Sequence, residues 1–249
     1  MASFSDEKYH PGLSVDCVIF GFNSNVLKVL LLKLKGTDTW ALPGGFVKSS
    51  ENVDDAAIRV LRERTGLEDI FLRQFQLFGS LERHDRAHTE KMIEKGIINK
   101  ADIPWFNQRF VTLGYYALVE YSKVNEPTAD YISEFCQWYP IDEVPELMLD
   151  HSQILARAYE ELKEQVSNHP VGLNLMPAQF TMPELQSLYE TILGKSLDRR
   201  NFQRKMLSYG ILRKTGKRQN GKAHKAPWLY EFDEENYASA LQADNYRGI

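Results

Sequence analysis

The chain has 249 residues, of which 43% are hydrophobic and 26% charged, and this length suffices for two modest domains. Its apolar runs fall short of the roughly 20 residues that a membrane-spanning helix needs. The polar start, with Asp6 and Glu7, is unlike a signal or transit peptide. We therefore expect a cytoplasmic protein without a membrane partner. Cys17 and Cys136 lie in apolar stretches, which favours buried thiols over a disulfide or a metal site.

Charge is distributed unevenly along the chain. The net charge is −4, yet the segment from Lys195 to Tyr230 holds eleven Lys or Arg residues and one acidic residue, Asp198. This segment therefore carries +10, which leaves −14 on the rest of the chain. Such a segment indicates binding of a polyanion by the C-terminal part, whereas the acidic remainder argues against nucleic acid wrapped around the whole molecule.

The pattern of apolar residues predicts the following elements in chain order. Strands at 15–22 and 26–34 flank a turn at 23–25, and a helix at 51–65 ends at Gly66. Further strands are expected at 70–82, 109–121 and 135–139, with a short helix near 89–95 and a long amphipathic helix at 152–166. The Pro- and Gly-containing stretch 168–177 predicts a boundary between domains at 1–167 and 168–249. Residues 83–108 form a polar insertion in the first domain.

The segment 42–67 resembles the Nudix box: a Gly, five residues, a Glu, seven residues, then Arg-Glu-apolar-x-Glu-Glu-x-Gly-apolar. The resemblance covers about 13–146 and implies an α/β/α sandwich around a mixed sheet. Family members with an intact box use Mg²⁺ to hydrolyse nucleoside diphosphates linked to another group. The residues that fall in register are Gly45, Glu51, Arg59, Leu61, Glu63, Gly66 and Leu67.

Two glutamates of the box are missing, because Val60 and Arg64 stand at their positions and leave Glu63 as the candidate metal ligand. Mg²⁺ needs several oxygen ligands near octahedral geometry. Arg64 would also repel a neighbouring cation by about a kcal/mol or more. We therefore expect inefficient hydrolysis and no required cofactor, with Mg²⁺ relevant only to residual hydrolase activity.

The surviving box residues also have structural interpretations. Arg59 and Glu63 are four residues apart on the predicted helix, a spacing that favours an ion pair. Gly44 and Gly45 are interpreted as a tight loop and Gly66 as a helix C-cap. An apolar stripe on the helix suggests that packing replaced the lost glutamate: Val53, Ala56, Ala57 and Val60.

A cleft beside the box suits a small-molecule sensor. The candidate lining residues lie at predicted strand ends and loops next to the box helix, and each also fits an alternative role. The aromatic residues also fit a core, and the two basic residues fit a solvated surface. The insertion also has two open roles, as a lid over the cleft or as a contact with a second subunit. The candidate ligand-binding residues are Trp40, Phe46, Arg83, His84 and Tyr115.

In the predicted C-terminal domain, 168–249, Thr181 and Glu184 form a capping box at the start of a helix that ends at Gly194. Asp198 is placed to cap a second helix that ends at Gly210. Two helices joined by a tight turn predict a helix-turn-helix.

In the second helix, Phe202 and Met206 are expected to pack inward, which leaves a polar face with donors for base edges and phosphates. Strands at 211–212 and 228–230 predict a hairpin with a cationic tip at 214–225, and hence a winged helix. Trp228 and Tyr230 are interpreted as hairpin core rather than base-stacking groups. The candidate DNA-binding residues are Arg199, Arg200, Asn201, Gln203, Arg204, Lys205, Lys214, Lys217, Arg218, Lys222, His224 and Lys225.

The combination resembles the Nudix-related transcriptional regulators, over about 13–233. Members respond to ADP-ribose in control of NAD metabolism or to arabinose in sugar catabolism, and act as homodimers on palindromic double-stranded DNA. The missing glutamates favour the sugar-sensing type, and so an effector that is a sugar or sugar phosphate rather than ADP-ribose. Two alternatives stay open. One is a low-activity, Mg-dependent Nudix hydrolase of ADP-ribose or related compounds, and the other is a non-catalytic RNA-binding or interaction protein.

Overall fold

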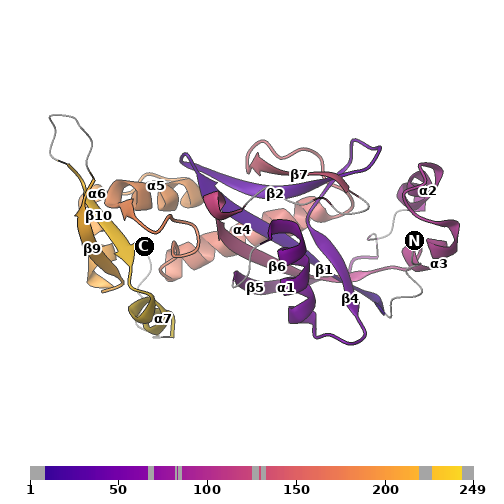
Figure 1. Ribbon diagram of the computed structural model, residues 1–249, viewed down its shortest axis with the longest axis horizontal. Coiled ribbons are helices and arrows are strands. Elements are labelled where there is room, and N and C mark those ends of the chain that lie inside the picture. The colour runs from indigo at the N-terminus through magenta and orange to yellow at the C-terminus, as the bar shows by residue number, and fades with distance from the viewer. Residues whose placement is uncertain are drawn as a thin grey trace. The chain divides into compact units, whose positions relative to one another are not determined.

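The computed structural model describes residues 9–66, 70–81, 83, 86–124, 129, 133–218 and 226–242. The chain divides into two compact units, shown in Figure 1. The first consists of residues 1–20, 28–119 and 123–158, and the second of 21–27, 120–122 and 159–249. Helix α4 (His151–Asn168) belongs to both units, with Ala158 in the first and Tyr159 in the second. Within the described residues, we find no helix that is both long and apolar enough to cross a membrane.

A seven-stranded sheet forms the centre of the first unit. The strand order is β3-β2-β1-β6-β5, with β4 paired to β1 and β7 paired to β2. The first two predicted strands are present as β1 and β2, whose near-continuous buried runs lie inside this order with a neighbouring strand on either side. The strands are β1 (Tyr9–Asn23), β2 (Val26–Leu34), β3 (Trp40–Ala41), β4 (Gly44–Lys48), β5 (Phe71–Phe78), β6 (Val111–Glu120) and β7 (Ser133–Pro140).

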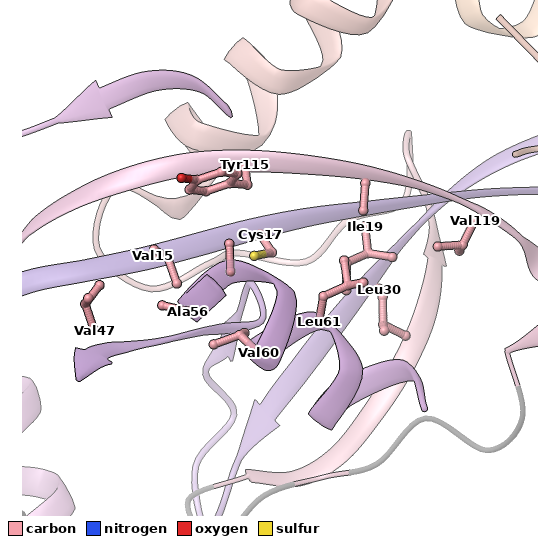
Figure 2. Packing of buried hydrophobic residues seen from close by; sticks show 12 residues of the cluster. Val15, Cys17, Ile19, Leu30, Val47, Ala56, Val60, Leu61, Tyr115 and Val119 are labelled. Atoms are coloured by element: carbon pink, nitrogen blue, oxygen red, sulfur yellow. The ribbon is translucent and has the colours of Figure 1, made fainter. Parts of the chain in front are cut away.

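Helices cover the sheet, and α1 (Val53–Thr65) is the box helix. Its apolar stripe, with Ala56 and Val60, packs onto the side chains of β1, including Val15 and Cys17 (Figure 2). The first residues of α4 lie behind the sheet in Figure 1, opposite α1. This is the layered α/β/α arrangement expected from the sequence. The shorter helices are α2 (Arg86–Glu94), η1 (Lys100–Asp102), α3 (Ile103–Phe106) and η2 (Tyr121–Lys123).

The prediction of a tight loop at Gly44 and Gly45 is wrong, because both residues lie in β4 and pair with β1. A Cβ on Gly44 would clash with Oδ1 of Asp16, and a Cβ on Gly45 would lie 2.8 Å from Cγ2 of Val60. The glycines are therefore needed for close approach to neighbouring side chains rather than for a turn.

The second unit contains a helix-turn-helix followed by a β-hairpin, as predicted. Its three-stranded sheet has the order β8-β10-β9. The core is formed by buried aromatic and aliphatic side chains, among them Phe180, Tyr189 and Tyr230. The sequence did not predict the final helix. The elements are β8 (Phe180–Thr181), α5 (Met182–Leu193), α6 (Arg199–Ser208), β9 (Leu212–Lys217), β10 (Trp228–Phe232) and α7 (Glu234–Gln242).

The caps predicted for α5 and α6 are confirmed. The Thr181 hydroxyl accepts a hydrogen bond from the Glu184 amide, and the Glu184 carboxylate accepts one from the Thr181 amide at 2.7 Å. The Asp198 carboxylate accepts the Asn201 amide at 2.8 Å. These bonds satisfy backbone donors that the first turn of a helix otherwise leaves unpaired, and so they fix where each helix begins.

Candidate effector site and nucleic-acid interface

The box residues Glu51 and Arg59 join the loop after β4 to helix α1. Nη2 and Nε of Arg59 lie 2.7 and 3.1 Å from the Glu51 carboxylate, and Nη2 also donates to the Phe46 carbonyl at 3.0 Å. The hydrogen bond from Arg59 lowers the pKa of Glu51 below its ordinary value. The predicted pair between Arg59 and Glu63 is present at 3.5 Å, although Glu51 is the closer partner. Glu51 is therefore an ionised residue that holds the loop after β4 against helix α1 through Arg59.

The residues at the metal position of the box do not fit Mg²⁺. Val60 is 1% exposed and packs in the core (Figure 2), and Arg64 is also buried. The Glu63 carboxylate is about half exposed and contacts Arg59. Across the part of the chain that the structure describes, no three His, Cys, Asp or Glu side chains gather as a metal site would require. A hard divalent cation would thus find too few oxygen ligands here.

The candidate ligand-binding residues lie in different environments. Trp40 is half-buried, with its ring centroid 4.8 Å from that of Tyr139. Tyr115 is 2% exposed and donates to Oδ1 of Asp54 at 2.5 Å, and its burial raises the pKa of the phenol. Phe46 and Arg83 take part in the two clusters described next. His84 lies outside the described residues.

An aromatic cluster joins the insertion to the box strand β4. Phe46 has ring centroids of Trp105, Phe106 and Phe110 at 5.4, 5.9 and 4.8 Å, and that of Tyr9 at 5.8 Å. Three of these contacts are edge-on, a geometry that aromatic rings favour. The end of the insertion is thus packed on the strand that precedes the box helix.

A buried ionic network holds Arg83, which the sequence left open as a solvated residue. Its Nη2 lies 3.0 Å from Oδ2 of Asp16 and its Nε lies 2.7 Å from Oδ1 of Asp150. The neighbouring His151 accepts the Leu42 amide at Nδ1, at 2.9 Å, and its Nε2 lies 3.8 Å from Oδ1 of Asp16. Burial lowers the pKa of His151 below its ordinary value. Sequence reasoning missed Asp16, Asp150 and His151, although an aspartate inside the apolar β1 run was a usable signal.

Helix α6 presents a polar, cationic surface. Phe202 is 3% and Met206 1% exposed, which confirms that they pack inward. The Arg204 guanidinium donates to Oδ1 of Asn201 at 2.8 Å, which orders two of the candidate donors. The candidate residues on the helix are exposed or half-buried: Arg199, Arg200, Asn201, Gln203, Arg204 and Lys205.

The candidate residues of the hairpin differ in what they contact. Lys214 and Lys217 are exposed, with their ammonium groups 5.1 and 5.0 Å from the centre of the Trp228 ring. Arg218 instead donates to both carboxylate oxygens of Glu184, at 2.6 and 3.0 Å. Three candidates lie outside the described residues: Lys222, His224 and Lys225.

The two aromatic residues predicted for the hairpin core differ in burial. Tyr230 is buried, as predicted, whereas the prediction for Trp228 is wrong, since it is 45% exposed. The physical reason is the extent of the sheet. Strand β8 pairs with Leu229 and Tyr230 but does not reach Trp228.

Comparison with known proteins matches both units to described families. The NUDIX domain model matches residues 10–162, and the NrtR DNA-binding winged helix domain model matches residues 172–232. The ADPR responsive transcriptional repressor NtrR of Acinetobacter baylyi is 29% identical over 246 residues, covering 95% of this chain and 88% of the relative.

Solved structures agree with these matches over nearly the whole chain. The crystal structure of Shewanella oneidensis NrtR has a TM-score of 0.72 and 26% identity, covering 96% of this chain and 98% of that one. The structure of the same protein complexed with a 27mer DNA has a TM-score of 0.70 and 25% identity, covering 95% and 97%. The chain therefore belongs to the Nudix family and joins its Nudix domain to an NrtR-type DNA-binding winged helix domain, the combination of the Nudix-related transcriptional regulators.

Proposed function

We propose that this protein is a transcriptional regulator that binds duplex DNA through its winged helix and senses a small molecule through its Nudix domain. The observation that carries the proposal is the cationic surface of α6 on a correctly capped helix-turn-helix. Arg, Asn and Gln side chains on a recognition helix have the donors that base edges in the major groove accept. Two similar proteins support the same function: the repressor from Acinetobacter baylyi, and the Shewanella oneidensis protein whose structure was solved in complex with DNA.

We propose ADP-ribose, or a related nucleoside diphosphate sugar, as the effector to test first. The relative from Acinetobacter baylyi is an ADPR responsive repressor, which outweighs the preference for a sugar or sugar phosphate drawn from the missing glutamates. Trp40 and Phe46 remain the strongest candidate contacts, because both are half-buried aromatic residues on the strands that precede the box helix. Arg83 and Tyr115 are buried and engaged with carboxylates, so we assign them to the support of the site.

Hydrolysis is not favoured as the function of the Nudix domain. Val60 and Arg64 are buried where carboxylates would be needed, and Glu63 alone is a weak ligand. Because the box supplies too few oxygen ligands for Mg²⁺, we propose effector binding that is independent of Mg²⁺.

We further propose a homodimer on a palindromic operator, since a two-fold symmetric reader places two recognition helices on two half-sites. The test is selection of bound sequences from random duplex DNA by the full chain. Recovery of an inverted repeat is expected. Failure to enrich any duplex sequence, together with tighter binding of single-stranded RNA at the same salt concentration, would overturn the proposal.

A further inference from the structure

Trp228 is a large aromatic side chain at the place where the three-stranded sheet has narrowed to two strands. It pairs with Lys217 across the hairpin, and 45% of its surface is exposed. The next residues, Leu229 and Tyr230, are covered by β8. The fold thus buries Tyr230 and leaves the indole of Trp228 outside the core.

The surroundings of Trp228 are cationic. The ammonium groups of Lys214 and Lys217 lie 5.1 and 5.0 Å from the ring centre, within the range of a cation–π interaction. The acidic groups Glu231 and Asp233 lie at the base of the hairpin, each 3.6 Å from Arg213. The acidic groups at the base are thus engaged by Arg213, whereas Lys214 and Lys217 are the cations that lie beside the indole.

We propose that Trp228 is a DNA-contacting residue whose indole packs on the deoxyribose of the duplex backbone, while Lys214 and Lys217 turn to the adjoining phosphates. This inference rests on the proposed function. A nucleic-acid backbone alternates an apolar sugar with an anionic phosphate, and an indole flanked by two flexible ammonium groups is complementary to both. We propose duplex DNA as the ligand of Trp228 because the second unit also carries the cationic face of α6.

The test measures affinity for fluorescent duplex DNA of random sequence at several salt concentrations, because backbone contacts do not need an operator. For the unmodified protein, the logarithm of affinity should fall linearly with the logarithm of salt concentration. Trp228→Ala should weaken binding about tenfold at every salt concentration, because the variant loses the aromatic contact with the nucleic acid. The slope should not change, because no charge is removed. Trp228→Phe should retain most of the affinity.

Two variants make the result specific. Lys217→Ala should reduce the magnitude of the salt slope by about 0.9, as expected for one lost phosphate contact. Phe135→Ala removes an aromatic side chain of similar exposure, 51%, from strand β7 of the Nudix domain, and should leave binding unchanged.

The inference fails if Trp228→Ala binds as tightly as the unmodified protein. It also fails if that variant loses slope as Lys217→Ala does, since the indole would then act only by placing the lysines. The inference also fails if single-stranded RNA binds more tightly than duplex DNA and Trp228→Ala weakens the binding of RNA, because the ligand of Trp228 would then be RNA. If the unmodified protein itself ignores duplex DNA at low salt, the proposed function fails first.

Discussion

At the scale of single residues, Arg83 is a guanidinium buried between the carboxylates of Asp16 and Asp150. A buried ion pair contributes little net stability, yet removal of one partner leaves a buried charge uncompensated. Arg83→Ala should therefore lower the free energy of unfolding by about 3–5 kcal/mol, measured by urea denaturation. Arg213→Ala, in an exposed pair, should change it by less than about 1 kcal/mol. A similar small effect for both variants would show that the network is not a structural support.

His151 links the same network to the pH dependence of stability. Burial lowers its pKa in the folded protein below the ordinary value of 6.5. Below that value the unfolded chain takes up a proton that the folded protein does not. Stability is therefore fully present above about pH 6.5 and is lost as the pH falls toward the lowered pKa.

His151→Asn should remove this loss, which amounts to at most about 1.4 kcal/mol per pH unit for one proton. The measurement is urea denaturation of both proteins between pH 7 and pH 5, with the difference taken to cancel other titrating groups. Parallel pH profiles for the two proteins would rule out His151 as the group responsible.

At the scale of elements, β4 depends on two glycines that pack against neighbouring side chains. A methyl group on Gly44 would lie 3.0 Å from the Val15 carbonyl oxygen and would also meet the Asp16 side chain. The backbone of β1 or β4 would therefore have to shift. Gly44→Ala should cost roughly 1–3 kcal/mol of stability by overpacking. Gly79→Ala is the matched control, because its Cβ meets Val111 at an ordinary 3.6 Å. Equal melting temperatures for the two variants would contradict this packing.

Helix α6 carries the prediction for DNA recognition. Arg200 is exposed on the recognition helix, so Arg200→Ala should weaken binding of a selected operator by roughly 1–3 kcal/mol and relax the base preference at one position. Arg157→Ala, on α4, removes the same charge elsewhere and should have a smaller effect that is uniform across sequences. Unchanged operator affinity of the Arg200 variant would exclude the assigned contact.

The sequence predicts the elements with strong local signals. Strand β2 has the bounds that its apolar run indicates, 26–34, and the caps of α5 and α6 are read from Thr181 and Asp198. Strand β4 is missed because glycines resemble a loop when their partners, Asp16 and Val60, are not yet known. Helix α7 is missed although Asp233 is a usable signal for its start, since the Asp233 carboxylate accepts the Asn236 amide at 3.1 Å.

The candidate sites are predicted less completely than the fold. The cationic face of α6 follows from helical spacing, a local property. The Arg83 network instead joins residues 67 positions apart in the chain, and only the register of the sheet and the start of α4 bring them together. The exposure of Trp228 likewise depends on where β8 ends, which no nearby residue indicates.

At the scale of the whole molecule, the charge of +10 on residues 195–230 and −14 on the remainder separates a DNA-binding part from a part that repels DNA. A regulator needs an effector with different affinities for the DNA-bound and free states. The central claim is that ADP-ribose, or a related compound, changes operator affinity without being hydrolysed.

The most direct measurement is the affinity of the full chain for a selected operator, with and without ADP-ribose, in parallel samples that contain EDTA or Mg²⁺. Arabinose and sugar phosphates serve as parallel effectors. We expect tight operator binding that ADP-ribose or a related compound shifts at least fivefold in both samples, consistent with a coupling of about 1 kcal/mol or more, while the effector is recovered intact from the sample with Mg²⁺. Operator affinity that no effector changes, combined with Mg²⁺-dependent cleavage of ADP-ribose, would contradict the account.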